Sequence, residues 1–277
     1  MTSVVLAAVS ALVWGTADYC GGRATQRGSA LAVTVVSQVL GLPVLVLCVV
    51  LIPGAFYASD LAWGAGAGAA GLFGIVLLYR SLSTGAMAVA APITAITGAL
   101  VPMSAGLLLE RMPSRLALGG AVCAVAAIAL VSLGPRRAGG RVTRQVVALA
   151  LAAGGMFGVF FVLLAQTHDD SGTWSLVAVR ATSIPLGLLL LAHRRISLRL
   201  PRAIVPWVML AGMGDIGANA LYVLAAQGGL LSVIAPIVAL YPVSTVLLAL
   251  ALDKERVRPL QIAGLGLAAT ALVLTAV

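Results

Sequence analysis

Long apolar runs, each about as long as a bilayer is thick, recur along this chain from end to end. A transmembrane helix needs about 20 mostly apolar residues. Inside lipid, backbone groups in runs of this length are satisfied only by helices, and the alternation typical of barrel strands is absent. The runs therefore predict about ten transmembrane helices, at residues 2–19, 29–51, 60–81, 86–109, 114–133, 144–166, 173–192, 202–226, 230–252 and 256–277.

The connections between these runs are too short for a water-soluble domain. Of the 277 residues, 61% are hydrophobic and 9% are charged, whereas soluble domains have about 25% charged residues. The first run lacks the basic start and cleavage site of a signal peptide, so we expect it to be retained as a helix. The three cysteines have no CxxC spacing and are interpreted as small hydrophobic residues. The chain is predicted to be an all-α integral membrane protein.

The two halves of the chain resemble each other. Six matches occur in the same order, at offsets of 143 to 145 residues: Trp14-Gly15 with Phe157-Gly158, Tyr79 with Tyr222, Gly85 with Gly228, Ala91-Pro92-Ile93 with Ala235-Pro236-Ile237, Glu110-Arg111 with Glu255-Arg256, and Gly119 with Gly264. We predict a first five-helix repeat at residues 1–133, a basic linker at 134–143 and a second five-helix repeat at 144–277. Since five is odd, the second repeat enters the membrane from the opposite side, which makes an inverted-topology repeat.

The loop charges predict the orientation. Loops after the odd-numbered helices and the residues beside them hold 14 of the 17 Lys and Arg residues, whereas those after the even-numbered helices hold only Arg111 and Arg115. Cytoplasmic loops of membrane proteins carry such an excess. We therefore expect the odd loops in the cytoplasm and both termini on the other side of the cell (inner or plasma) membrane. Cations placed this way do not predict a nucleic-acid partner.

The chain resembles the drug/metabolite transporter superfamily, in its ten-helix EamA-type branch, over essentially its whole length. The resemblance rests on Trp14-Gly15, on the two Ala-Pro pairs, on the Glu-Arg segments at 110 and 255, on Gly119 and Gly264, and on Arg180 in the seventh helix. It implies secondary transport of a small metabolite, amino acid or drug through a central cavity. One departure is that the second helix has Ser37-Gln38 where such proteins often carry an arginine.

Charged residues inside apolar spans are costly and tend to face a cavity. Asp215, Asn219 and Tyr222 share one face of the eighth helix, and Asp18 and Arg180 lie within the first and seventh helices. One interpretation is a cavity in which Asp215, its principal ionisable group, binds a proton or a cationic substrate. The alternative is that Asp215 and Arg180 form a buried structural ion pair. Asp18 could equally lie at the membrane interface.

Proline and hydroxyl residues coincide in the fourth and ninth helices. Proline frees backbone carbonyls that can bind a polar ligand or let a helix flex, although Ser and Thr hydroxyls also bond back to their own helix. The candidates for the cavity wall here are Thr94, Thr97, Tyr241 and Ser244. Trp14 could line the cavity or belong to the packed core. We expect the cavity to be lined by the first, third, fourth, sixth, eighth and ninth helices.

Two further groups of residues have simpler interpretations. Glycines in the third helix (Gly64, Gly68, Gly71) and in the sixth (Gly154, Gly158) are spaced for close helix packing. His168, beside two aspartates, is interpreted as a solvated loop residue.

The sequence favours a secondary transporter over three other classes. It has no phosphate-binding Gly-Lys-Ser/Thr loop, which excludes an ATP-driven pump. An intramembrane enzyme is the least favoured alternative, because no HExxH or GxSxG motif is present, and we expect no enzyme activity. A channel or facilitative pore is the other alternative, although no filter loop or charge ring is evident. The expected partners are a small-molecule substrate and the lipid bilayer, with transport coupled to protons or to exchange. No cofactor or metal is expected.

Overall fold

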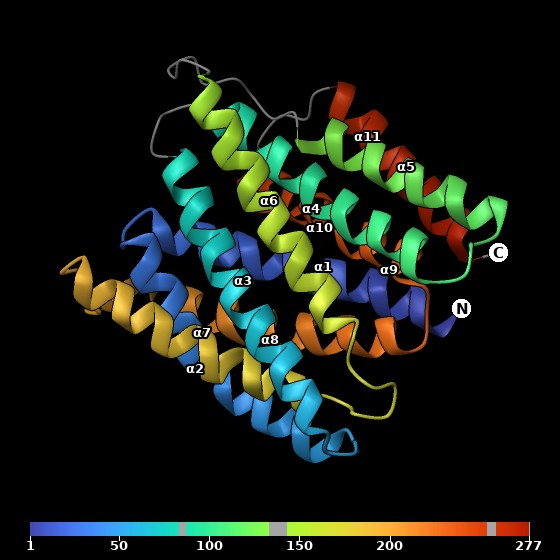
Figure 1. The fold of residues 1–277 in the computed structure, drawn as a ribbon. Coiled ribbons are helices and arrows are strands. Elements are labelled where there is room, and N and C mark those ends of the chain that lie inside the picture. The colour runs from blue at the N-terminus through green and yellow to red at the C-terminus, as the bar shows by residue number, and fades with distance from the viewer. Residues whose placement is uncertain (83–86, 133–142, 254–258, 277) are drawn as a thin grey trace.

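The computed structural model describes residues 1–82, 87–132, 143–253 and 259–276, and these form helices and turns without a strand (Figure 1). The helices are α1 (Thr2–Thr25), α2 (Ala30–Leu51), α3 (Ala58–Leu82), α4 (Met87–Leu109), α5 (Arg115–Ser132), α6 (Arg144–Leu164), α7 (Trp174–His193), the short 3₁₀ helix η1 (Arg202–Ile204), α8 (Val205–Gln227), α9 (Leu231–Val238), α10 (Tyr241–Asp253) and α11 (Pro259–Ala276). The predicted linker at 134–143 and the Glu255-Arg256 pair fall almost wholly outside the described residues.

The predicted all-helical membrane fold is confirmed. Within the described ranges, eight helices are long and apolar enough to cross a membrane, and shorter apolar helices at Ile93–Leu109 and Leu231–Thr245 account for the fourth and ninth predicted spans. The largest boundary error concerns α1, which continues to Thr25 rather than ending at residue 19. Its last turns are less apolar than the rest, so the apolar run ends before the helix does.

The ninth predicted span is two helices, α9 and α10, and not one. The break lies at Ala239 and Leu240, directly before Pro242 in the first turn of α10. Proline lacks the N–H that would bond to the carbonyl of Val238, and its ring clashes with that carbonyl. A helix that starts anew avoids both problems, because the first turn does not use that N–H.

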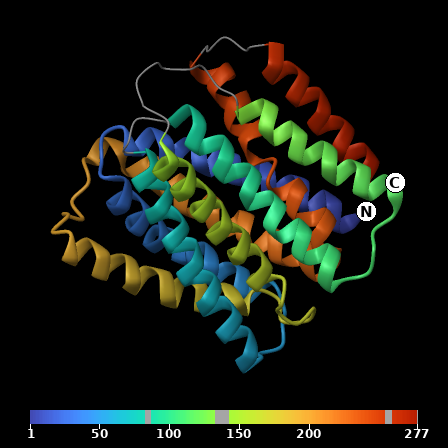
Figure 2. The ribbon, with the colours of Figure 1, turned by 45° about the horizontal axis from the view of Figure 1, so that its top comes forward.

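The helices pack in pairs that the repeat relates to one another. The repeat makes α1 equivalent to α6, α2 to α7, α3 to α8, and α4 to α9 with α10. The contact of α1 with α8 thus corresponds to that of α6 with α3, and the contact of α2 with α8 to that of α7 with α3. In the same way, α4 packs on α6, and α9 and α10 pack on α1. α5 and α11 are each other's equivalents and lie side by side (Figures 1 and 2). Exchanging the two five-helix halves therefore reproduces the contact pattern, as an inverted repeat requires.

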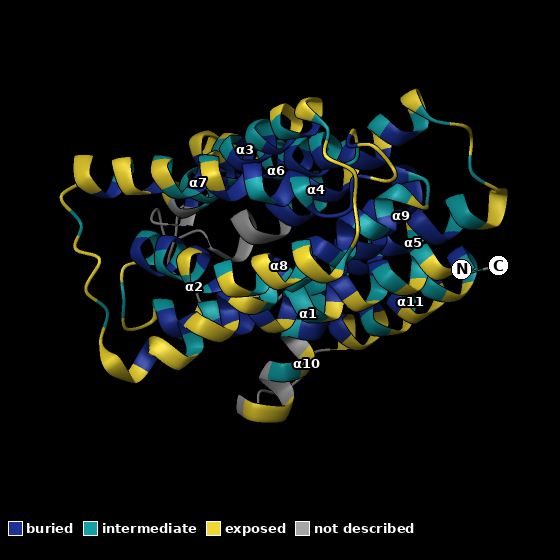
Figure 3. Cartoon of the chain, turned by 90° about the horizontal axis from the view of Figure 1, so that it is seen from below, coloured by how far each residue is buried: buried dark blue, intermediate teal, exposed yellow. Residues whose placement is uncertain are grey.

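The two ends of the bundle differ in charge. Figure 1 shows both termini at one end, here called the terminal end, with the loops at 52–57, 110–114, 165–173 and 228–230. The opposite end carries the loops at 26–29 and 194–201, which include Arg27, Arg194 and Arg199, and is called the basic end. Exposed residues lie on the outer faces of the helices (Figure 3), and they include many large apolar side chains, as lipid contact requires.

The prediction of close packing at glycines is confirmed for α3 and α6. A Cβ at Gly64 would collide with the carbonyl oxygen of Ser175, and one at Gly68 with that of Val179, so α3 lies directly against the backbone of α7. On α6, a Cβ at Gly154 would meet the carbonyl of Thr94, and one at Gly158 the side chain of Val101 on α4. Small residues allow this close approach of helices in lipid.

Replacing Gly64 with alanine is expected to destabilise the protein, because the added methyl must push α3 away from the backbone of α7. Overpacking of this kind costs about 1–3 kcal/mol. The matched control is Gly155→Ala in α6, where a Cβ meets no atom within 4 Å. We expect the Gly64 variant to melt several degrees below the Gly155 variant in detergent. Equal melting temperatures would contradict the packing role of Gly64.

Candidate functional site

A cavity of about 460 Å³ lies within the bundle. Its wall comes from α1, α2, α3, α4, α6, α7, α8, Ala239 and the start of α10. Relative to the sequence-based expectation, α2 and α7 are additional. The polar and charged residues of the wall are Asp18, Thr25, Thr34, Ser37, Gln38, Thr94, Arg180, Ser183, Asp215 and Asn219.

The cavity extends from the middle of the bundle toward the basic end. It is lined there by the last turns of α1, including Gly22 and Thr25, and by the first turns of α2, including Val33. In the other direction, the bundle is filled by the main apolar core, in which Tyr222, Leu164 and Leu231 are fully buried or nearly so. The space is thus continuous toward one end and blocked toward the other.

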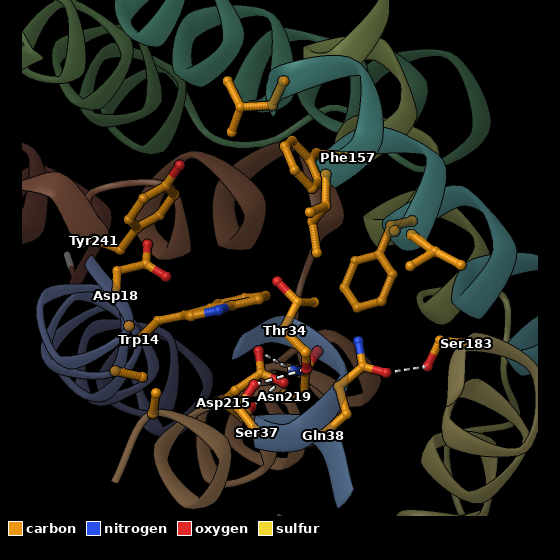
Figure 4. Close-up of a pocket in the computed structure, with 18 of the residues that line it drawn as sticks. Trp14, Asp18, Thr34, Ser37, Gln38, Phe157, Ser183, Asp215, Asn219 and Tyr241 are labelled. Atoms are coloured by element: carbon orange, nitrogen blue, oxygen red, sulfur yellow. Dashed lines mark hydrogen bonds between the residues drawn. The ribbon is translucent and has the colours of Figure 1, made fainter. Parts of the chain in front are cut away.

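Arg180 and Asp215 form an ion pair in the cavity wall. Arg180 is only 6% exposed, and Asp215 is its one ion-pair partner in the described part of the chain. The amide nitrogen of Asn219 donates to the Asp215 carboxylate (3.2 Å) and to its backbone carbonyl (2.7 Å), which fixes the carboxylate (Figure 4). The alternative in which Asp215 is paired therefore describes this structure.

Two polar atoms beside this pair have no partner among the described residues. They are Nε of Arg180, a donor, and Oδ1 of Asn219, an acceptor. Buried polar atoms in folded proteins are nearly always hydrogen-bonded. Both atoms are themselves buried, so in this structure they are unsatisfied groups within the wall and do not face the cavity space.

Asp18 is the cavity carboxylate without a partner. It is exposed to the cavity space, and no hydrogen bond or ion pair joins it to any residue that the structure describes. It lies beside Trp14 and Tyr241, and Trp14 separates it from Asp215 (Figure 4). With Arg180 neutralising Asp215, the charged groups of the cavity carry a net charge of −1 when all three are ionised.

The contribution of α2 was not predicted. Ser183 of α7 donates to the side-chain carbonyl of Gln38 (2.9 Å), and Ser37 and Thr34 lie one turn or less away on α2 (Figure 4). These three residues of α2 are spaced i, i+3 and i+4, so they share one face of an otherwise apolar helix. That spacing was the signal that could have identified this part of the wall.

Aromatic rings cover much of the remaining wall. Trp14 contacts Phe161 edge-on at 5.4 Å between centroids, Phe160 at 6.4 Å and Tyr241 at 6.3 Å. Phe157, which the repeat relates to Trp14, also lines the cavity. The ring of Trp14 thus lies between the two halves of the bundle, in contact with α6 and α10.

Three predicted residues lie outside the cavity lining. Tyr222 is fully buried, and its hydroxyl donates to the carbonyl of Phe161 (2.7 Å). Ser244 donates to the carbonyls of Ala11 and Tyr241. Thr97 lies against Gly154 of α6. The other seven predicted residues, Trp14, Asp18, Thr94, Arg180, Asp215, Asn219 and Tyr241, do line it.

The cavity is symmetric in position and asymmetric in chemistry. At the offset of 143 that relates Trp14 to Phe157, Asp18 corresponds to Phe161, Ser37 to Arg180, and Leu72 to Asp215, and all of these residues line the cavity. Each repeat therefore supplies the same positions to the wall, but the charged residues occupy one member of each pair. The wall is therefore charged on one side of the repeat's symmetry and uncharged on the other.

The terminal end is closed by contacts between the two repeats, here called the clasp. His168 Nδ1 lies 2.8 Å from the buried carboxylate of Asp60, and its backbone N–H also donates to that carboxylate. The His168 ring stacks on Tyr57 at 4.0 Å, and the Tyr57 hydroxyl donates to Asp170 at 2.8 Å. His168 is thus a structural partner of Asp60, and its interpretation as a merely solvated residue is wrong.

Further hydrogen bonds extend the clasp. Ala55 N–H donates to the carbonyl of Asp170 (2.8 Å). Within the second repeat, Gln227, at the end of α8, donates to the carbonyls of His168 and Gly172 and to the Ser171 hydroxyl, which holds the loop at 165–173 in place. The hydrogen bond to Asp170 raises the pKa of Tyr57, so its hydroxyl stays protonated and donates throughout the physiological range.

A second connection between the repeats involves the Glu-Arg segment of the first repeat. Both carboxylate oxygens of Glu110 accept from the backbone N–H of Leu231, at 3.1 and 2.8 Å, at the first residue of α9. A carboxylate at a helix N-terminus is stabilised by the helix dipole and the unpaired N–H groups there. The equivalent Glu255 lies outside the described residues.

A helical membrane bundle of two inverted repeats around a partly polar cavity is the architecture of a membrane transporter. The chain matches the EamA-like transporter family over residues 1–133 and 144–277, and it belongs to that family. A solved structure, titled only as the crystal structure of a protein, has the same fold, with a TM-score of 0.80 at 17% identity over 99% of this chain and 96% of its own. No curated protein matches the chain.

Proposed function

We propose that the chain is a secondary transporter that moves a small metabolite, amino acid or drug by alternating access through the central cavity. The observation that carries this proposal is that the cavity extends toward the basic end while the clasp and the apolar core close the terminal end. A binding site that is accessible from one side at a time is what a carrier requires. A channel would instead need a path open at both ends.

The loop charges support an orientation with the basic end in the cytoplasm and both termini outside, in the inner or plasma membrane. In that orientation the structure is open to the cytoplasm. Because the two repeats supply equivalent helices to the wall, exchanging their conformations would close the basic end and open the terminal end.

Transport is proposed to be driven by coupling to protons or by exchange for a second solute. Asp18 is the group that supports this, because an unpaired carboxylate in a membrane-embedded cavity is stable only with a proton, a cation or water beside it. A proton and a solute that compete for this carboxylate would be moved in opposite directions.

Alternating access is tested by a cysteine in the cavity wall. Ser37→Cys is nearly isosteric and lines the cavity near the basic end. In a variant lacking Cys20, Cys48 and Cys123, we expect this thiol to react with a membrane-impermeant reagent from the cytoplasmic side rapidly, and from outside slowly but completely. Asp169→Cys and Arg194→Cys, both exposed in loops at opposite ends, serve as markers that react from outside only and from the cytoplasm only.

Two outcomes would contradict this proposal. Reaction of the Ser37→Cys thiol from one side only, however long the exposure, would mean that access does not alternate. Fast reaction from both sides together with single-channel steps in a planar bilayer would instead make the protein a channel. If each marker thiol reacted from the side opposite to the one expected, the proposed orientation would be wrong. The conclusion on alternating access would not change, because it depends only on the Ser37→Cys thiol.

A further inference from the structure

The charge of the cavity indicates what it binds. Its wall contains two acidic residues, Asp18 and Asp215, and one basic residue, Arg180. Arg180 and Asp215 neutralise each other. Asp18 remains, without a hydrogen bond or ion pair to any described residue and exposed to the cavity space. A cation bound beside Asp18 would balance this charge.

The surroundings of Asp18 narrow the kind of cation. Trp14 and Tyr241 flank it (Figure 4), with ring centroids 6.3 Å apart and an interplanar angle of 41°. Phe160 and Phe161 also contact Trp14, each edge-on. Aromatic faces attract organic ammonium groups and provide apolar contact for a hydrocarbon body. A small metal ion would instead need several oxygen ligands. Asp18 could not share such an ion with Asp215, because the Asp215 carboxylate is paired with Arg180.

We propose that the cavity binds an organic cation: a primary or substituted ammonium group on Asp18, with an apolar or aromatic body against Trp14, Phe160 and Phe161. The polar side of the ligand, where it has one, would face the polar part of the wall, which includes Ser37, Gln38 and Asn219. The inference rests on the proposed transport function and names its substrate class.

The test uses three probes that share a phenylethyl body and differ in charge. They are 2-phenylethylammonium (cation), 2-phenylethanol (neutral) and 3-phenylpropionate (anion), each titrated by calorimetry into the purified full chain in nanodiscs. We expect the cation to bind at least about tenfold more tightly than the alcohol, and the anion not to bind, because a carboxylate–ammonium contact with ring packing supplies a difference of this order.

Asp18→Asn should reduce affinity for the cation by about tenfold or more and leave affinity for the alcohol unchanged. Asp169→Asn, which removes the same charge from an exposed loop, should change neither. Tighter binding of the anion, absence of binding by all three probes, or equal cation affinity in Asp18→Asn would overturn the inference. The comparison of the three probes on the unmodified protein needs no variant. It therefore tests the preference for a cation even if Asp18→Asn fails to fold. Two-sided labelling of Ser37→Cys would still support transport if this inference failed.

Discussion

Asp215→Asn is expected to destabilise the protein by about 3–5 kcal/mol, the usual cost of removing one partner of a buried ion pair. Arg180 is 6% exposed and has no other ion-pair partner in the described chain. Without Asp215, its guanidinium would remain charged within the bundle. Thermal melting in detergent, followed by size-exclusion chromatography, measures this loss.

The double variant Asp215→Asn/Arg180→Gln should recover most of that stability, because it removes both charges together. Asp169→Asn is the control, and a change at such an exposed position should stay within about 0.5 kcal/mol. A single variant that melts like the unmodified protein, with no gain in the double variant, would contradict a structural role for the pair. Arg180 would then be available to a ligand in place of Asp215.

Most of the fold could be predicted because each span must satisfy its own backbone inside lipid. The length of an apolar run therefore marks a helix directly, and nine of the ten predicted spans match one continuous helix. The break between α9 and α10 could not be located, since proline is tolerated in many membrane helices. Whether Pro236 or Pro242 interrupts one depends on what packs around the freed carbonyls.

The site was predictable where a residue is out of place in an apolar run. Asp18, Arg180 and Asp215 stand out in this way, and all three line the cavity. Whether Tyr222 lines the cavity could not be predicted. It shares the Asp215 face of α8 but lies two turns further along, where the apolar core is packed. Helical periodicity gives the face of a helix, and the depth at which a cavity ends depends on the neighbouring helices.

The sequence left the pairing of the carboxylates open between two interpretations. The eighth-helix stripe made Asp215 the expected principal ionisable group, with an Asp215–Arg180 ion pair as the alternative, and the structure has that pair and leaves Asp18 without a partner among the described residues. Which of two acids meets the single arginine depends on how α1, α7 and α8 are placed around the cavity. Periodicity within one helix carries no information on that placement.

Asp60→Asn is expected to open the terminal end and to increase reaction of the Ser37→Cys thiol from outside by about ten- to a hundredfold. The Asp60 carboxylate is fully buried and accepts two hydrogen bonds from His168, which ties the start of α3 to the loop at 165–173. Hydrogen bonds to charged groups contribute about 1.5–3 kcal/mol each. Their loss weakens the closed terminal end and shifts the population toward the outward-open state by the corresponding factor.

Tyr57→Phe is the matched comparison, because it removes only the hydrogen bond to Asp170 and retains the ring that stacks on His168. Since Asp170 is exposed, this change should increase outside labelling by less than about fivefold. If Asp60→Asn lowered the melting temperature and left outside labelling unchanged, the clasp would be a structural contact that stays closed during transport. The opening would then have to occur elsewhere, and the contact of Glu110 with the start of α9 would be the next element to test.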